Sequence, residues 1–239
     1  MTPILFVEGL KVRYRSSKAQ LPLSSNSSQP PLPVVFQYPL MQVGKGECLG
    51  IVGQTGCGKT TLLNALFQPR FPGVVSYRRA EILGRDRNSI PAPELYSRIS
   101  YLPQYAQNAL NPSLTVRNHF RHVQRSLQTV EENIWHAWME ELKLSPQVLE
   151  HFPYQLSGGM KQRLILLLGF LKRPELYILD EPSSGIDAVT MKIILDFLRR
   201  RKEEGVTFLM VSHDLGLVSN FSDRALILEE QLCAKQNPC

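Results

Sequence analysis

A glycine-rich segment between two apolar segments constrains this chain more than any other feature. It reads Gly53-Gln54-Thr55-Gly56-Cys57-Gly58-Lys59-Thr60 and satisfies the pattern G-x-x-x-x-G-K-[ST]. Residues 47–52 before it predict a buried strand, and residues 60–67 after it predict a helix. Strand, loop and helix in this order are typical of a phosphate-binding loop, in which backbone N–H groups and the helix N-terminus surround an anion.

Within this loop, each residue type has an expected task. Lys59 is expected to neutralise the β- and γ-phosphates of a nucleotide, and Thr60 to hold Mg²⁺. The residues expected to contact the nucleotide are Gly53, Gln54, Thr55, Gly56, Cys57, Gly58, Lys59, Thr60 and Thr61. Cys57 has two interpretations, because a thiol at a helix N-terminus is often reactive, whereas a small side chain there also simply fills space.

Two adjacent carboxylates, Asp180 and Glu181, follow the apolar run 176–179, which predicts a strand. Ligands of α/β proteins bind at the carboxyl ends of such strands. Because neighbouring buried carboxylates are costly without a cation, we expect Asp180 to hold Mg²⁺ and Glu181 to act as general base on a water molecule. A helix cap before Pro182 is the structural alternative.

A second candidate anion site precedes the helix predicted over residues 158–171. Ser157, Gly158 and Gly159 place a hydroxyl and free backbone N–H groups at its N-terminus. The phosphate loop already serves one nucleotide, so a second anion site is useful for the nucleotide of a partner subunit. The alternative is a capped helix with a glycine-rich entry.

Together these motifs resemble the ATP-binding cassette (ABC) ATPases, over nearly the whole chain. The resemblance implies ATP and Mg²⁺ as ligands and ATP hydrolysis. It also implies head-to-tail pairing, with ATP between the phosphate loop of one cassette and Ser157, Gly158 and Gly159 of the other. The matching residues are Gln104, a catalytic and Mg²⁺-contacting glutamine; Asp187, at the dimer interface; His213, a catalytic histidine at the γ-phosphate; and Tyr14, which stacks on adenine.

The order of apolar segments predicts an α/β fold with a parallel sheet. Further strands are predicted over residues 4–15, 34–41, 97–102, 206–211 and 225–228, helices over 189–202 and 214–220, and helical structure over 113–149. The resemblance adds an antiparallel β subdomain and an inserted helical subdomain. We expect one domain, 1–239, with 1–104 and 157–239 as its core and 105–156 as the helical subdomain. Residues 20–33, rich in Ser, Pro and Gln, predict a loop.

Composition narrows the setting of the protein. A hydrophobic content of 43% with 20% charged residues is ordinary for a soluble globular protein. The longest apolar run, 164–171, is too short to span a bilayer, and residues 1–7 do not resemble a signal peptide. The four cysteines lack metal-site spacing, which favours free thiols in a reducing compartment.

Residues 107–116 narrow the family resemblance. They contain Asn111, Pro112 and Thr115 in the pattern Asn-Pro-x-x-Thr, which resembles importers of peptides, nickel and other metal chelates; an Asn-Pro helix start is the alternative. The predicted function is the ATP-hydrolysing subunit of such an importer, peripheral at the cytoplasmic face of the inner membrane. The implied partners are a second ABC ATPase subunit, identical or paralogous, two transmembrane permease subunits and an extracytoplasmic solute-binding protein.

The sequence leaves a soluble ABC ATPase open as an alternative and disfavours a P-loop GTPase or kinase. The net charge of +6 keeps open a soluble ABC ATPase that acts on nucleic acid or ribosomes. Such proteins usually contain two cassettes or long coiled-coil insertions, so no nucleic-acid partner is expected. A P-loop GTPase is disfavoured because the chain lacks the guanine-binding pattern Asn-Lys-x-Asp.

Overall fold

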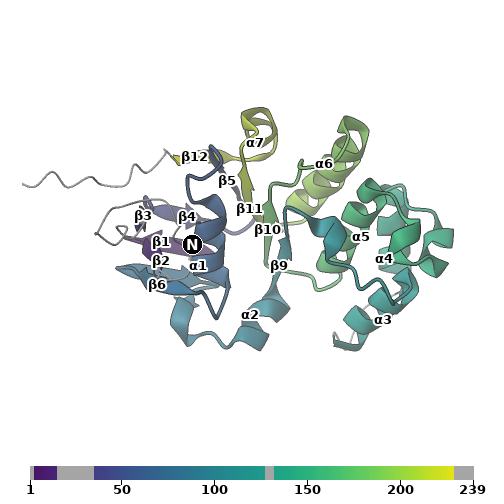
Figure 1. Ribbon diagram of the computed structural model, residues 1–239, viewed down its shortest axis with the longest axis horizontal. Coiled ribbons are helices and arrows are strands. Elements are labelled where there is room, and N and C mark those ends of the chain that lie inside the picture. The colour runs from purple at the N-terminus through teal and green to yellow at the C-terminus, as the bar shows by residue number, and fades with distance from the viewer. Residues whose placement is uncertain (1–2, 15–34, 127–131, 229–239) are drawn as a thin grey trace, which may run out of the picture.

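A parallel sheet lies at the centre of the molecule. The structure is a computed structural model that describes residues 3–14, 35–126 and 132–228. Within these residues the sheet has five strands in the order β12-β5-β11-β10-β9 (Figure 1). Their bounds are β5 Cys48–Gly53, β9 Ile99–Leu102, β10 Leu176–Asp180, β11 Thr207–Ser212 and β12 Arg224–Leu228. The predicted α/β class with a parallel sheet is therefore confirmed.

The central strands are apolar throughout because both faces of the sheet are covered. Successive side chains of a strand point to opposite faces, and β10 shows this directly. Tyr177 and Leu179 join one hydrophobic core, whereas Leu176 and Ile178 join the other. All four side chains are fully buried. The strand therefore joins two cores and holds its carboxyl end in a fixed position.

The helices cover both faces of this sheet. Their bounds are α1 Lys59–Phe67, α2 Ala92–Arg98, α3 Val116–Ser126, α4 Glu132–Glu141, α5 Gly158–Phe170, α6 Ala188–Glu203 and α7 Leu215–Phe221. Short 3-10 turns span Arg87–Ser89, Ala106–Asn108, Pro146–Glu150 and Pro153–Gln155. Figure 1 shows α3, α4 and α5 gathered at one end of the molecule and the antiparallel strands at the other. Among the described residues, no helix combines the length and the apolar character needed to cross a membrane.

Two antiparallel sheets form around the N-terminal part of the chain. One has the order β4-β1-β7-β8 and the other β3-β2-β6. The bounds are β1 Leu5–Glu8, β2 Lys11–Tyr14, β3 Val35–Gln37, β4 Met41–Val43, β6 Gly73–Ser76, β7 Arg79–Ile82 and β8 Arg85–Asp86. These sheets agree with the antiparallel β subdomain that the resemblance implied.

Several predicted boundaries in this region were wrong. The single strand expected over 4–15 is two strands in different sheets, because Gly9 has a left-handed φ of 66° that breaks the extended chain. The strand expected over 34–41 is likewise divided into β3 and β4. The strand expected over 97–102 begins at Ile99, because α2 continues to Arg98.

Other expectations have a partial outcome. The helical structure expected over 113–149 is α3, α4 and a 3-10 turn, while the boundaries 105–156 of the helical subdomain stay a prediction. Cys48 and Cys57 are free, buried thiols. The loop expected over 20–33, together with Cys233 and Cys239, lies outside the described residues.

Candidate functional site

Four parallel strands bring the predicted catalytic groups to one edge of the sheet. β5 ends in the phosphate loop, β10 in Asp180, and β11 in Ser212 next to His213. Gln104 follows β9 by two residues and is half-buried in a turn. Because these strands are neighbours and run in the same direction, their carboxyl ends converge, as ligand sites in α/β sheets require.

The phosphate loop depends on two glycines in the left-handed region. Gly56 and Gly58 have φ values of 91° and 100°, which other residues rarely adopt. Space also restricts Gly58, because a Cβ atom there would lie 2.5 Å from the Phe36 ring. The Tyr38 hydroxyl donates to the Gly58 carbonyl at 2.8 Å and secures the entry to α1. Only glycine at position 58 therefore allows this loop to turn into its helix.

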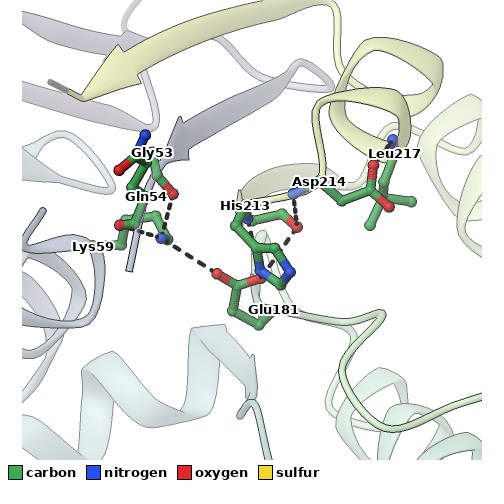
Figure 2. Close-up of polar contacts among 8 residues, drawn as sticks. Gly53, Gln54, Lys59, Glu181, His213, Asp214 and Leu217 are labelled. Atoms are coloured by element: carbon green, nitrogen blue, oxygen red, sulfur yellow. Dashed lines mark hydrogen bonds and ion pairs between the residues drawn. The ribbon is translucent and has the colours of Figure 1, made fainter. Parts of the chain in front are cut away.

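Lys59 is a buried cation at the centre of the site, with 7% of its surface exposed. Its amine donates to the carbonyl oxygens of Gly53 at 2.6 Å and Gln54 at 3.0 Å. The same nitrogen lies 3.4 Å from Glu181 Oε1 (Figure 2). A phosphate bound in the loop would lie next to the positive charge of Lys59, as the motif predicts.

Glu181 links Lys59 to the end of β11. Its Oε2 atom accepts hydrogen bonds from the Ser212 hydroxyl at 3.2 Å and the His213 amide at 3.1 Å. The same atom is 2.7 Å from His213 Nδ1 (Figure 2). Glu181 is 6% exposed and has a left-handed φ of 48°, which is uncommon for a residue with a side chain. The strained backbone and three contacts aim one carboxylate at the space in front of the loop.

Asp180 is also buried, yet only one of its oxygens has a partner. Oδ2 accepts a hydrogen bond from the Tyr101 hydroxyl at 2.6 Å, whereas Oδ1 is buried without a protein partner. Burial raises the pKa of Asp180, the Tyr101 hydrogen bond lowers it, the Glu181 charge raises it and Lys59 lowers it, with a net increase. A cation bound to Oδ1 would offset the free-energy cost of burying this carboxylate.

The donor set fits Mg²⁺. Asp180 Oδ1 and the exposed Thr60 hydroxyl are hard oxygen ligands, and Mg²⁺ is usually bound by one or two carboxylates together with substrate phosphates and water. Among the described residues, no group of three or more His, Cys, Asp or Glu side chains forms a closed metal site. The arrangement therefore suits a cation that arrives with a nucleotide.

Tyr14 lies beside the phosphate-loop helix. Its hydroxyl and that of Thr61 are hydrogen-bonded at 3.1 Å. Its ring contacts Phe36 at 6.5 Å and Phe71 at 5.3 Å between centroids. Tyr14 is 36% exposed, so part of its ring is available to a base. Stacking on adenine stays a prediction, and Phe36 joins Tyr14 as an aromatic neighbour of the loop.

A cavity of about 590 Å³ borders the phosphate loop. Gly53, Gln54, Thr55 and His213 line it, together with Leu215 and Ile227. Cys57 is 1% exposed, and its sulfur would lie 2.5 Å from a Cβ atom at Gly53. Its packing favours the interpretation of Cys57 as a space-filling side chain under the loop.

Ser157, Gly158 and Gly159 lie at the start of α5, where Ser157 caps the helix. Its hydroxyl accepts a hydrogen bond from the Met160 amide at 3.2 Å. A Cβ atom at Gly159 would lie 2.9 Å from the Thr190 hydroxyl. Asp187 caps α6 and also accepts from that hydroxyl at 2.8 Å. Within the described chain, no hydrogen bond or ion pair joins Ser157, Gly158 or Gly159 to the phosphate loop, so one chain does not bring the two anion sites into contact.

Sequence reasoning missed several supporting residues. They are Phe36, Tyr38, Tyr101, Thr190 and Ser212. Only Ser212 offered a signal, because it lies between the end of the strand predicted over 206–211 and His213. The others contact site residues that are distant in sequence, and no local pattern marks those contacts. Phe36 and Tyr38 contact Gly58, Tyr101 contacts Asp180, and Thr190 contacts Gly159.

The comparisons with known proteins agree with this geometry. A family model described as ABC transporter matches residues 39–184, and a second, described as an AAA domain, matches residues 150–219. Two solved structures show the same fold. They are cbiO1 from Clostridium perfringens (TM-score 0.73, 22% identity, 96% of this chain and 86% of that one) and a dimeric bacterial ABC transporter cassette (TM-score 0.74, 22% identity, 95% and 94%).

Curated relatives have transport names. The dipeptide transport ATP-binding protein DppD of Caldanaerobacter subterraneus is 32% identical over 79% of this chain. The nickel import ATP-binding protein NikE of Brucella abortus and the oligopeptide transport ATP-binding protein OppF of Escherichia coli are each 30% identical, over 80% and 79% of this chain. The chain spans 61% of DppD, 73% of NikE and 58% of OppF. With the family model over most of its length and the phosphate loop, Asp180 and Glu181 at one sheet edge, the chain belongs to the ABC transporter family.

Proposed function

We propose that this chain hydrolyses ATP and acts as the energy-supplying subunit of an importer. The observation that supports hydrolysis most is the contact of Glu181 with both Lys59 and His213 at the mouth of the phosphate loop. Lys59 binds the phosphates, Glu181 accepts a proton from the attacking water, and His213 orients Glu181 and contacts the γ-phosphate. Gln104 is the remaining catalytic residue of the proposal.

Asp180, Thr60 and Gln104 are the proposed contacts of Mg²⁺. Bound there with the nucleotide, Mg²⁺ neutralises charge on the β- and γ-phosphates. The unpartnered Oδ1 of Asp180 supports this role. Tyr14 positions adenine, and the backbone N–H groups of residues 53–61 hold the phosphates.

Glu181→Gln tests the hydrolysis mechanism. An amide cannot take the proton, so the steady-state rate should fall about 100-fold or more. ATP affinity, measured by calorimetry in EDTA, should be unchanged, because Lys59 and the loop remain. Glu175→Gln is the matched control, since Glu175 is an exposed partner of Arg98 at the opposite end of β10. A Glu181→Gln variant that retains turnover would exclude this residue as the base.

We further propose that two such subunits bind ATP between them. The phosphate loop of one chain and Ser157, Gly158 and Gly159 of the other enclose one nucleotide, with Asp187 at the interface. The separation of the two anion sites within one chain supports this arrangement. ATP then favours the closed pair and hydrolysis reopens it, a two-state element biased by a ligand.

The proposed cargo is a peptide or a nickel or other metal chelate. The names of DppD, NikE and OppF and the segment 107–116 support this class. The proposed partners are a second ABC ATPase subunit, two transmembrane permeases and an extracytoplasmic solute-binding protein, with the chain peripheral at the cytoplasmic face of the membrane. No nucleic-acid partner is proposed.

Co-purification tests the importer. The tagged chain is isolated from detergent-solubilised native membranes, and the bound proteins are identified by mass spectrometry. Permeases and a second ATPase subunit are the expected result, and a solute-binding protein would lead to the cargo. Recovery of only ribosomes or nucleic acid would contradict transport and favour the alternative of a soluble ABC ATPase.

A further inference from the structure

The hydroxyl of Tyr101 is the only protein donor to either carboxylate oxygen of Asp180 among the described residues. Its Oη atom donates to Oδ2 at 2.6 Å, while Oδ1 is buried without a partner. Tyr101 belongs to β9, which runs parallel to β10. In the register of these two strands Tyr101 lies opposite Ile178. Its side chain therefore reaches two residues along the neighbouring strand, to the carboxylate at the end of β10.

We propose that Tyr101 is a positioning residue that holds Asp180 with Oδ1 directed toward the metal bound with ATP. This inference rests on the proposed function. A carboxylate on a short side chain rotates between two orientations, and a hydrogen bond to one oxygen determines where the other points. Such outer contacts orient metal ligands, and their loss typically weakens metal binding 10- to 100-fold.

The surroundings of Tyr101 favour this role over simple packing. Tyr101 is 40% exposed and lies along a groove of about 290 Å³ that Leu63, Tyr96 and Lys172 also line. An aromatic ring is sufficient to cover the groove, and phenylalanine would provide the same ring without the hydroxyl. Only the Tyr101 hydroxyl contacts Asp180. The hydrogen bond to this carboxylate therefore explains why the residue is tyrosine and not phenylalanine.

Tyr101 also stands three residues before Gln104, a proposed Mg²⁺ contact that follows the end of β9. One strand end thus supplies both Gln104 and the residue that orients Asp180. Residues 105–156 follow directly after this strand end. A shift of β9 would move both groups together relative to Thr60, which lies in α1.

Tyr101→Phe tests the inference, because it removes the hydroxyl and keeps the ring. The experiment uses the full chain with Glu181→Gln to prevent hydrolysis, and Mn²⁺ in place of Mg²⁺. ATP affinity is measured by calorimetry with Mn²⁺ and with EDTA, and the ratio gives the factor by which the metal strengthens binding. We expect Tyr101→Phe to reduce this factor about tenfold and to leave ATP affinity in EDTA unchanged.

Tyr96→Phe is the matched control. The Tyr96 hydroxyl lies in the same groove but donates to the Phe67 carbonyl at 3.3 Å and not to a carboxylate. This variant should keep the full effect of Mn²⁺. Thermal unfolding of both variants in EDTA gives a separate measure of their folding.

Two outcomes would overturn the inference. They are an unchanged Mn²⁺ effect in Tyr101→Phe and a stronger one. An unchanged effect that accompanies an equal loss of ATP affinity with and without metal would indicate a general structural role. If the parent with Glu181→Gln itself binds ATP no better with Mn²⁺ than with EDTA, the proposed metal site fails instead, and the two failures are distinguished.

Discussion

The beginnings of α1 and α5 are both glycine-rich helix N-termini, yet their polar groups are used differently. At α1, Lys59 contacts Glu181, which contacts His213, so groups from three strand ends face a common space. At α5, the Ser157 hydroxyl caps its own helix, and Gly159 packs against Thr190. The first region has the chemistry of an enzyme site, whereas the second is a supported surface. This difference supports the proposal that the second region acts on a nucleotide bound by another subunit.

Lys59→Ala should have the largest effect and would test the α1 side. Removal of a buried cation leaves the phosphates without their main charge partner, so ATP affinity should fall about 100-fold, as for two charge-assisted hydrogen bonds. Calorimetry on the isolated chain measures this. Lys192→Ala, an exposed lysine of α6, is the control. If Lys59→Ala binds ATP as tightly as the parent, the start of α1 is not the phosphate-binding site.

Ser157→Asp tests whether the start of α5 acts separately from the phosphate loop at α1. Aspartate is as good a helix cap as serine, so the thermal midpoint should be unchanged. Its charge repels a nucleotide bound by the partner, so hydrolysis by the assembled pair should fall about tenfold or more. ATP affinity of the isolated chain should remain that of the parent. If that affinity falls as in Lys59→Ala, the two regions act within one chain and the comparison is wrong.

Gly159→Val tests whether the start of α5 packs tightly against Thr190 of α6. Its Cβ would lie 2.9 Å from the Thr190 hydroxyl and 3.0 Å from the Thr190 methyl group. Thr190 cannot easily move, because it is hydrogen-bonded to Asp187. The free energy of unfolding should fall by about 2 kcal/mol in urea titrations. In the double variant with Thr190→Ala the two losses should not add, and strict additivity would show that the helices are not in tight contact.

Asp180→Asn should have the smallest effect and the opposite sign. Burial raises the pKa of Asp180 above its ordinary value of 3.8, despite the Tyr101 hydrogen bond and Lys59. The folded state therefore binds this proton more tightly than the unfolded state, and stability decreases as pH rises through the folded pKa. Asparagine does not ionise, so in metal-free buffer its thermal midpoint should exceed that of the parent by a margin that grows from acidic to neutral pH.

Asp223→Asn is the control for that pH dependence. Desolvation raises the pKa of Asp223, but hydrogen bonds from the Cys48 amide and Lys202 outweigh it and lower the pKa. Its stabilisation is thus present above the ordinary pKa of 3.8 and is lost as pH falls through the folded pKa. Asp223→Asn should be less stable than the parent at neutral pH, and the difference should disappear in acid. The same pH trend in both variants would contradict the assigned causes.

Much of the candidate site could be predicted because its motifs are short and local. Residues 53–60 specify strand, turn and helix within one segment, and Asp180 follows its own apolar strand directly. The N-terminal strands were less predictable. The turn at Gly9 sends β1 and β2 into different sheets, and β1 pairs with β7 across more than 70 residues. Such pairing depends on partners that no local window contains.

The amino-acid sequence alone predicts which groups bind phosphate, accept a proton and hold Mg²⁺, because these properties belong to residue types and close spacing. Only the tertiary structure decided which of them meet. It placed Glu181 between Lys59 and His213, connected Tyr101 to Asp180, and packed Gly159 against Thr190. Each of these contacts joins different elements of the fold, and their positions follow from strand order and helix packing.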